Sequence, residues 1–301
     1  MSSQASAEPQ SLPCHHCGKS TNVRCSHCQI IHYCNRDCQK IMWKSHKAFC
    51  KTMSSMDVTG RGIDKSTCVI IDGLGPLGPD SDFLRSTQHA LQVWGVPTKV
   101  LDIYKGRSQL VTQIACLLKH PTKLPGSILM LGWGSGDEDF GFSKSTEFRE
   151  AVVEWCKVRG GRFLVQGERT RLFGRWPQWF GLEWVDGGYF RTDHQCHAVG
   201  TDALHWSKSW YPQAKGAVTS RYNVKACMLQ DVQAQDALFA SVDGATTYSL
   251  VPGFGGRTVQ EGSTAVAWAK VGEGTVSFFG DVNYEEPTLD IMSVIAMARD
   301  A

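Results

Sequence analysis

Cysteine and histidine residues near the start of the chain have spacings that suit metal binding. Between residues 14 and 50 they follow the pattern C-x2-C-x7-C-x2-C-x5-C-x3-C-x7-H-x3-C. Eight such soft ligands are enough for two Zn²⁺ ions, each held by four protein ligands in a tetrahedral site. A segment this short buries too little apolar surface to fold unaided, so metal binding must supply much of its folding free energy. The eight candidate ligands are Cys14, Cys17, Cys25, Cys28, Cys34, Cys38, His46 and Cys50.

This stretch resembles a MYND-type zinc finger, which it matches in ligand order, in spacing and in the run from Cys38 through Trp43 to Cys50. The cross-braced arrangement of that family implies that the ligand pairs alternate between two zinc ions. All coordination positions are taken by protein ligands, so no position remains for a catalytic water. The implied ligand sets are Cys14, Cys17, Cys34 and Cys38 for the first zinc, and Cys25, Cys28, His46 and Cys50 for the second.

The resemblance also implies a kind of partner, because MYND fingers bind short proline-containing peptides of the Pro-x-Leu type in a shallow groove. The matching positions in this chain are Ser26, Gln39 and Trp43. A tryptophan face can stack on a proline ring, and a glutamine amide can hydrogen-bond an extended backbone. The alternative is that Trp43 packs against the linker or the rest of the chain.

The remaining composition predicts a soluble intracellular protein of the nucleus or cytoplasm. Five further cysteines are scattered, which argues against a disulfide framework and for a reducing compartment. Residues 1–13 are polar and lack the apolar run of a signal peptide. No apolar stretch reaches the roughly 18 residues that a membrane span requires, so no membrane contact is expected. The scattered cysteines are Cys68, Cys116, Cys156, Cys196 and Cys227.

The charge balance is close to neutral overall and mildly basic in the finger. The formal net charge of +2 falls to about −1 when seven thiolates and two zinc ions are counted. Residues 14–51 hold seven basic side chains against one acid, Asp37. With metal and thiolates included the finger carries about +3, which could steer acidic partners or be a solvated face. Nucleic acid is not expected as a partner at this charge.

Hydrophobic patterning divides the chain into four parts. Residues 1–13 are predicted to be a disordered lead-in, 14–50 the finger, 51–66 a polar linker and 67–301 a large second domain. Within the finger, the pattern predicts a short strand at 31–33 and a helix at 37–49. Ile41 and Met42 are expected to pack inward beside the metal.

The second domain is predicted to be an α/β domain with a mainly parallel sheet. Short apolar runs alternate with segments of helical periodicity, which is typical of strands joined by right-handed helical crossovers. Further along, the pattern predicts a helix over 172–184 covering a sheet edge, two strands within 222–241, a hairpin over 265–279 and a closing helix over 287–299. The first predicted strands are 68–71, 100–103, 127–131 and 162–166, and the helices between them are 81–94, 109–119 and 146–158.

This domain weakly resembles the class I glutamine-amidotransferase-like fold, including its trehalose-utilisation-like relatives. The matching stretches are Val69 to Gly75, Trp155 to Gly167, and Gly272 to Asn283. Active members place a cysteine at the turn after the strand that 162–166 would form, where this chain has Gly167-Glu168-Arg169. A carboxylate cannot replace a thiolate in forming a thioester, so the domain is expected to be catalytically degenerate.

Two other groups of residues could bind ligands. Asp72, Asp137 and Glu168 would lie at the carboxyl ends of parallel strands, where α/β sheets bind small molecules or Mg²⁺. The alternative is that such residues close turns. His194 and Cys196 form the only other Cys/His cluster, together with His197, and lack the further ligand pair that a zinc site needs.

These observations leave two hypotheses of different classes. In the first, the chain is a non-enzymatic adaptor whose finger docks proline-containing peptides. In the second, the α/β domain is an enzyme acting on an unknown small molecule, and the finger only recruits it. A MYND-bearing lysine methyltransferase is excluded, because the sequence has neither an Asn-His-x-Cys stretch nor the two halves of a SET domain around the finger.

Overall fold

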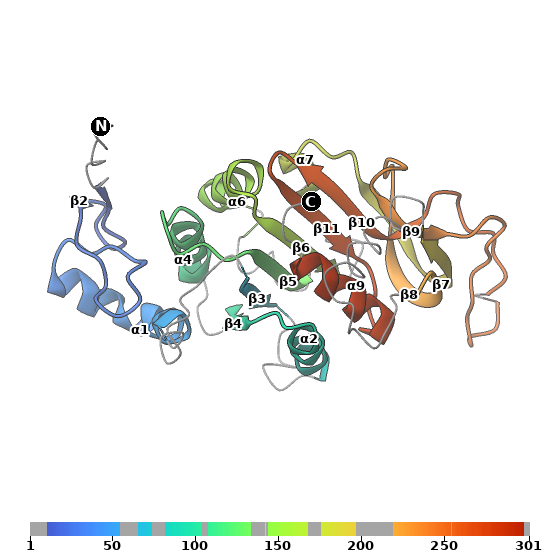
Figure 1. The fold of residues 1–301 in the computed structure, drawn as a ribbon, viewed down its shortest axis with the longest axis horizontal. Coiled ribbons are helices and arrows are strands. Elements are labelled where there is room, and N and C mark those ends of the chain that lie inside the picture. The colour runs from blue at the N-terminus through green and yellow to red at the C-terminus, as the bar shows by residue number, and fades with distance from the viewer. Residues whose placement is uncertain are drawn as a thin grey trace, which may run out of the picture.

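The structure places a small metal-ligand-rich unit at one end of a large sheet that carries helices on both faces (Figure 1). It is a computed structural model that describes residues 11–54, 66–73, 82–103, 108–133, 142, 144–167, 176–196, 219–253 and 255–297. The predicted disorder of residues 1–10 and most of the predicted linker lie outside these residues.

The finger consists of a two-stranded ladder, two turns that carry cysteine pairs, and one long helix. Strand β1 (Leu12–Pro13) pairs antiparallel with β2 (Ser20–Thr21). Helix α1 (Arg36–Ser54) follows Asn35, whose Oδ1 accepts the Cys38 backbone N–H at 2.8 Å. This is an N-cap contact, and Asp37 in the first turn complements the positive end of the helix.

Several local predictions for the finger were wrong. Residues 12–13 form a strand rather than part of a disordered lead-in, and 51–54 are the last turn of α1 rather than linker. The predicted strand at 31–33 is reduced to a single bridge between Arg24 and His32. Ile41 is 62% exposed and does not pack inward, whereas Met42 is partly buried against the core.

Five strands of the large sheet run parallel; the sequence predicted four of them as parallel strands and placed the one at 274–279 only in a hairpin. Their order is β4 (Thr98–Asp102), β3 (Cys68–Asp72), β5 (Ser127–Trp133), β6 (Arg162–Gly167) and β11 (Gly274–Phe279). Strands β3 and β6 are buried at every position, so each side chain faces one of two helix layers. Val69 and Ile71 of β3 face one layer, while Cys68 and Ile70 face the other.

The other four strands are antiparallel, so a mainly parallel sheet describes only half of the domain. They are β10 (Thr264–Val271), β8 (Arg221–Gln230), β7 (Val185–Cys196) and β9 (Ala237–Ser241). Strand β9 pairs with both β7 and β10, and β8 pairs with both β7 and β10, so these four strands close into a barrel-like ring. Closure of the ring pairs backbone N–H and C=O groups that would otherwise be unpaired at open strand edges.

Helices cover the two faces of the sheet in separate groups. Helices α4 (Ser108–Leu118), α6 (Thr146–Arg159) and α7 (Trp176–Trp179) pack on one face, together with buried residues of the finger. Helices α2 (Asp82–Val93) and α9 (Glu286–Met297) pack on the opposite face (Figure 1). None of the helices in the described part of the chain is long and apolar enough to cross a membrane.

The predicted helix over 172–184 is wrong in length and in place. Within the described part of this stretch only Trp176–Trp179 is helical. Trp176 and Trp184 are buried in the core on the face of the sheet that α4 and α6 cover. There Trp176 makes edge-on contacts with the rings of Phe163 and Trp184. These tryptophans therefore pack on a sheet face instead of covering an edge.

Candidate metal centres and interaction surface

Two similar turns present the first four cysteines. In each turn the N–H of the residue after the second cysteine bonds the carbonyl of the first: Gly18 to Cys14, and Gln29 to Cys25, both at 2.9 Å. Gly18 and Gln29 have positive φ angles of 73° and 61°. The left-handed conformation reverses the chain directly after each pair, so both sulfurs of a pair face the same point.

The eight metal-ligand residues gather into two groups of four. Within each group the ligand atoms all lie within 4.8 Å of one another. The groups are the two sets implied by the MYND resemblance: Cys14, Cys17, Cys34 and Cys38 in the first group, and Cys25, Cys28, His46 and Cys50 in the second.

The separations between ligand atoms fit zinc. A tetrahedral ion with Zn–S bonds of about 2.3 Å separates its sulfurs by about 3.8 Å. In the first group the Cys17 and Cys34 sulfurs are 3.5 Å apart, and those of Cys17 and Cys38 are 3.9 Å apart. In the second group the Cys25 and Cys50 sulfurs are 3.8 Å apart. His46 Nε2 lies 3.6 Å from the Cys28 sulfur, which identifies Nε2 as the ligand atom. Both groups fit one Zn²⁺ each, two per chain.

The two centres differ in exposure. All four residues of the second group are buried, whereas Cys17 of the first is exposed and Cys34 partly exposed. Burial alone would raise the pKa of Cys14, but backbone N–H groups of Cys17, Cys34 and His16 donate to its sulfur and lower the pKa to about 6. The first centre is therefore the more accessible to solvent, and at Cys14 the surrounding backbone N–H groups favour the thiolate.

Aromatic rings enclose the second centre. The His46 ring has Tyr33 at 5.7 Å, Phe49 at 6.0 Å and Trp43 at 6.0 Å between ring centroids. Tyr33 and Phe49 are each 2% exposed, while Trp43 is 40% exposed. Trp43 thus shields one side of the histidine ligand and presents the rest of its indole to solvent.

The three residues predicted to bind a partner lie on one side of the second centre. The Gln39 amide Nε2 donates to the Cys25 sulfur at 3.5 Å, so Gln39 sits beside the turn that holds Ser26. Ser26 is exposed, and Trp43 follows Gln39 by one helical turn. The contact from Gln39 to a ligand sulfur was not predicted, because it joins residues brought together only by the folded finger.

A second group of polar residues, which the sequence analysis did not identify, joins the finger to the segment that follows α4. His120, just after α4, accepts at Nδ1 from the backbone N–H of Thr122 and of Lys123. Its Nε2 therefore carries the proton and donates to the Gln29 carbonyl at 3.1 Å. Burial, followed by the nearby Arg24 charge, lowers the pKa of His120 to about 4, so it stays neutral. Lys123 also donates to the Cys28 carbonyl at 3.5 Å.

The predicted ligand pocket at the strand ends is only partly described. Asp72 is buried at the end of β3, while Asp137 and Glu168 lie outside the described residues. The nearby ends of β6 and β11 are joined by protein contacts. Gln166 Oε1 accepts from the Tyr284 hydroxyl at 2.6 Å, and its amide nitrogen donates to the Asp281 carbonyl.

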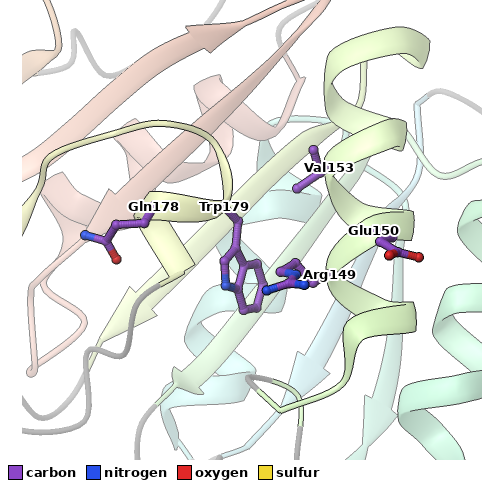
Figure 2. A pocket seen from close by; sticks show the side chains of 5 residues that line it. All are labelled: Arg149, Glu150, Val153, Gln178 and Trp179. Atoms are coloured by element: carbon purple, nitrogen blue, oxygen red, sulfur yellow. The ribbon is translucent and has the colours of Figure 1, made fainter.

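A cavity of about 450 Å³ opens between α6 and α7. Figure 2 shows the Trp179 indole beside the Arg149 side chain, with Val153 further along the same helix and Glu150 directed away. The Arg149 cation and the Trp179 ring face each other in this lining, and the described lining residues include no cysteine, serine or histidine. The sequence pattern did not single out this place, whose lining residues are Arg149, Glu150, Val153, Gln178 and Trp179.

The Asp193-to-His197 cluster is not assembled as a metal site within the described chain. His194 is fully buried in β7, and its Nδ1 lies 3.2 Å from the Thr192 carbonyl. Cys196 is two residues along the same strand, and His197 lies outside the described residues. Burial lowers the pKa of His194 to about 4, which is typical of a neutral core histidine.

Comparison with known proteins supports the finger alone. The family model of the MYND finger matches residues 14–50. Tudor domain-containing protein 1 of Oryzias latipes is 32% identical over 79 residues, which is 26% of this chain and 6% of that protein. SET domain and MYND-type zinc finger protein 6 of Schizosaccharomyces pombe is 46% identical over 42 residues, 14% of this chain and 9% of that protein. Ubiquitin carboxyl-terminal hydrolase 19 of Arabidopsis thaliana is 47% identical over 45 residues, 15% of this chain and 7% of that protein.

The chain thus spans less than a tenth of the length of these relatives. Their names describe a Tudor domain protein, a SET domain and MYND-type zinc finger protein and a ubiquitin hydrolase, so these relatives do not share one named activity. Residues 14–50 are a MYND-type finger, a zinc-binding module of protein interaction.

The solved structures that match most of this chain resemble it only distantly. A β-galactosidase of Halorubrum lacusprofundi has a TM-score of 0.41 at 13% identity, covering 82% of this chain and 32% of that one. A β-galactosidase of Bacillus circulans has a TM-score of 0.43 at 9% identity, covering 87% and 34%. Likeness at this level carries no activity to the chain, and it does not confirm the amidotransferase-like resemblance.

Proposed function

We propose that this chain is an intracellular adaptor whose MYND finger docks proline-containing peptides of partner proteins. Ser26, Gln39 and Trp43 form the docking surface. In this proposal residues 14–50 are the interaction module, and the α/β part from residue 67 is an amidotransferase-like scaffold without the cysteine that glutamine hydrolysis needs.

One observation carries the proposal: Trp43 is 40% exposed on helix α1, directly beside the His46 ligand ring of the second centre. Each metal group already has four protein ligands, so the ions have no open position for chemistry. What remains for the finger is recognition. An indole on a rigid helix is a common anchor for a proline ring, because the flat ring covers apolar area with little loss of side-chain freedom.

The test compares peptide binding by the full chain and by Trp43→Ala. A synthetic peptide with a Pro-Ala-Leu core is titrated by fluorescence anisotropy, and zinc content is measured on the same samples. We expect the variant to bind at least about tenfold more weakly, the loss typical of an interface anchor, while about two zinc ions per chain remain bound.

The matched control is Tyr189→Ala, which removes an aromatic ring of similar exposure (49%) from strand β7. It should bind the peptide as tightly as the unchanged chain. Equal affinity of Trp43→Ala and the unchanged chain, with zinc intact, would show that the groove assignment is wrong.

A further inference from the structure

Helix α1 carries five basic residues on one face. Their positions follow the helical repeat at i, i+4, i+8, i+11 and i+15, which places them along a single stripe. At a rise of 1.5 Å per residue the stripe is about 22 Å long. All five side chains belong to exposed residues. We name this set the basic row: Arg36, Lys40, Lys44, Lys47 and Lys51.

Within the part of the chain that the structure describes, the basic row has a single counter-charge. Lys40 lies 3.8 Å from Asp37, and both side chains are largely exposed. Among the described residues, no carboxylate lies within ion-pair distance of the other four members. Like charges one turn apart destabilise a helix, so the row opposes the folding of α1 rather than supporting it.

The row also has no role in packing the finger. The opposite side of α1 carries Phe49 and Met53, which are buried in the core shared with the sheet. The Ser45 carbonyl on that side accepts from the Gln113 side chain of α4 at 3.5 Å. The basic face therefore lies opposite the buried side of α1, and α1 itself lies at one end of the molecule (Figure 1).

The basic row borders the proposed peptide site. Trp43 follows Lys40 by three residues and precedes Lys47 by four, so it lies one turn from each along the edge of the row. On the other side of Trp43 are the metal ligands His46 and Cys50. A peptide that covers the indole must therefore pass beside these lysines.

We propose that the partner segment carries acidic residues next to its proline motif, and that these pair with the basic row. This inference rests on the proposed docking function and adds to it a charge requirement on the partner. Exposed ion pairs contribute little affinity singly, but several together raise the association rate and select partners. A short acidic peptide fits better than nucleic acid, because the thiolate-rich zinc centres beneath α1 weaken its field at longer range.

The experiment uses the full zinc-loaded chain and two synthetic peptides that differ only in charge. Both contain the Pro-Ala-Leu core, one flanked by a run of glutamates and the other by glutamines. We expect the glutamate peptide to bind about tenfold more tightly at low salt. The difference should disappear near 1 M salt, where the Debye length is about 3 Å.

The double variant Lys44→Gln/Lys47→Gln should lose the preference for glutamate and keep its affinity for the glutamine peptide. The matched control, Lys144→Gln/Lys157→Gln, removes two exposed lysines at either end of α6 and should keep the preference.

The outcomes separate the two proposals. Equal binding of both peptides by the unchanged chain overturns the acidic partner and leaves proline docking standing, whereas binding of neither overturns both. A glutamate preference that persists in Lys44→Gln/Lys47→Gln overturns the assignment to the basic row. Tighter binding of a single-stranded oligonucleotide of equal charge than of the glutamate peptide overturns the assignment to a peptide partner.

Discussion

Gln39 has two possible roles in the finger, and its contact with Cys25 allows them to be separated. Its side-chain amide donates to a sulfur of the second zinc centre at 3.5 Å. Hydrogen bonds to ligand atoms hold them in place and spread their charge, so their loss weakens metal binding. A residue engaged in this way has one N–H left for a peptide backbone.

We expect Gln39→Ala to lower the affinity of the second centre for zinc by about tenfold. Competition with a chromophoric chelator measures this affinity. Trp43→Ala is the control, since Trp43 contacts the His46 ring but donates to no ligand sulfur among the described contacts. If Gln39→Ala binds zinc as tightly as the unchanged chain, the contact to sulfur has no energetic role.

At the scale of elements, the β10–β11 hairpin is held by close contacts between backbones. Its turn contains Gly272, with φ of 65°, and an added Cβ there would lie 2.3 Å from the Lys157 carbonyl oxygen. The neighbouring Glu273 N–H donates to the same carbonyl at 3.0 Å. The turn thus docks directly on the last turn of α6 and fixes β11 beside β6.

We expect Gly272→Ala to lower the free energy of unfolding by about 3 kcal/mol or more, because it adds a backbone clash to the cost of a left-handed residue. Urea denaturation measures the change. Gly244→Ala is the matched control: its φ is 70°, and nothing lies within 4 Å of the added Cβ. That variant should lose only about 1–2 kcal/mol. Equal losses of unfolding free energy in the two variants would show that the clash with α6 adds nothing to the cost of the left-handed conformation.

At the scale of the whole molecule, the finger shares its core with one face of the sheet. Phe49 and Met53 of α1 belong to the same buried cluster as Leu110 and Ile114 of α4. Helix α9 packs on the opposite face, in a separate cluster. Because zinc supplies much of the folding free energy of the finger, loss of zinc should uncover α4 but not α9.

We therefore expect chelation of zinc to raise the hydrogen-exchange rate of residues 36–54 and 108–118 and to leave residues 286–297 protected. Exchange is followed by mass spectrometry, with a chelated and zinc-reloaded sample as control. Unchanged protection of residues 108–118 would mean that α4 is stable without the finger. Equal loss in residues 286–297 would mean that the chain unfolds as one unit.

The sequence alone determined the features that depend on short-range spacing. Two cysteines separated by two residues can bind one metal ion within a single turn of the chain, so the eight ligands could be identified from their spacing, and the family resemblance supplied their pairing. Strands β3, β5 and β6 were predictable because both of their faces are buried, which requires an unbroken apolar run. Helix α6 was predictable from its periodicity and from Gly160, which ends it in the left-handed conformation with φ of 72°.

The tertiary structure decided what depends on distant parts of the chain. No local pattern shows that β11 inserts between β6 and β10, or that β9 joins both β7 and β10 to close the ring. Strand β7 was missed because its exposed and buried residues do not alternate regularly. The contact from His120 to Gln29 likewise joins residues far apart in sequence. Such pairings depend on which surfaces remain available after the local elements form. The spacing of neighbouring residues does not indicate which surfaces these are.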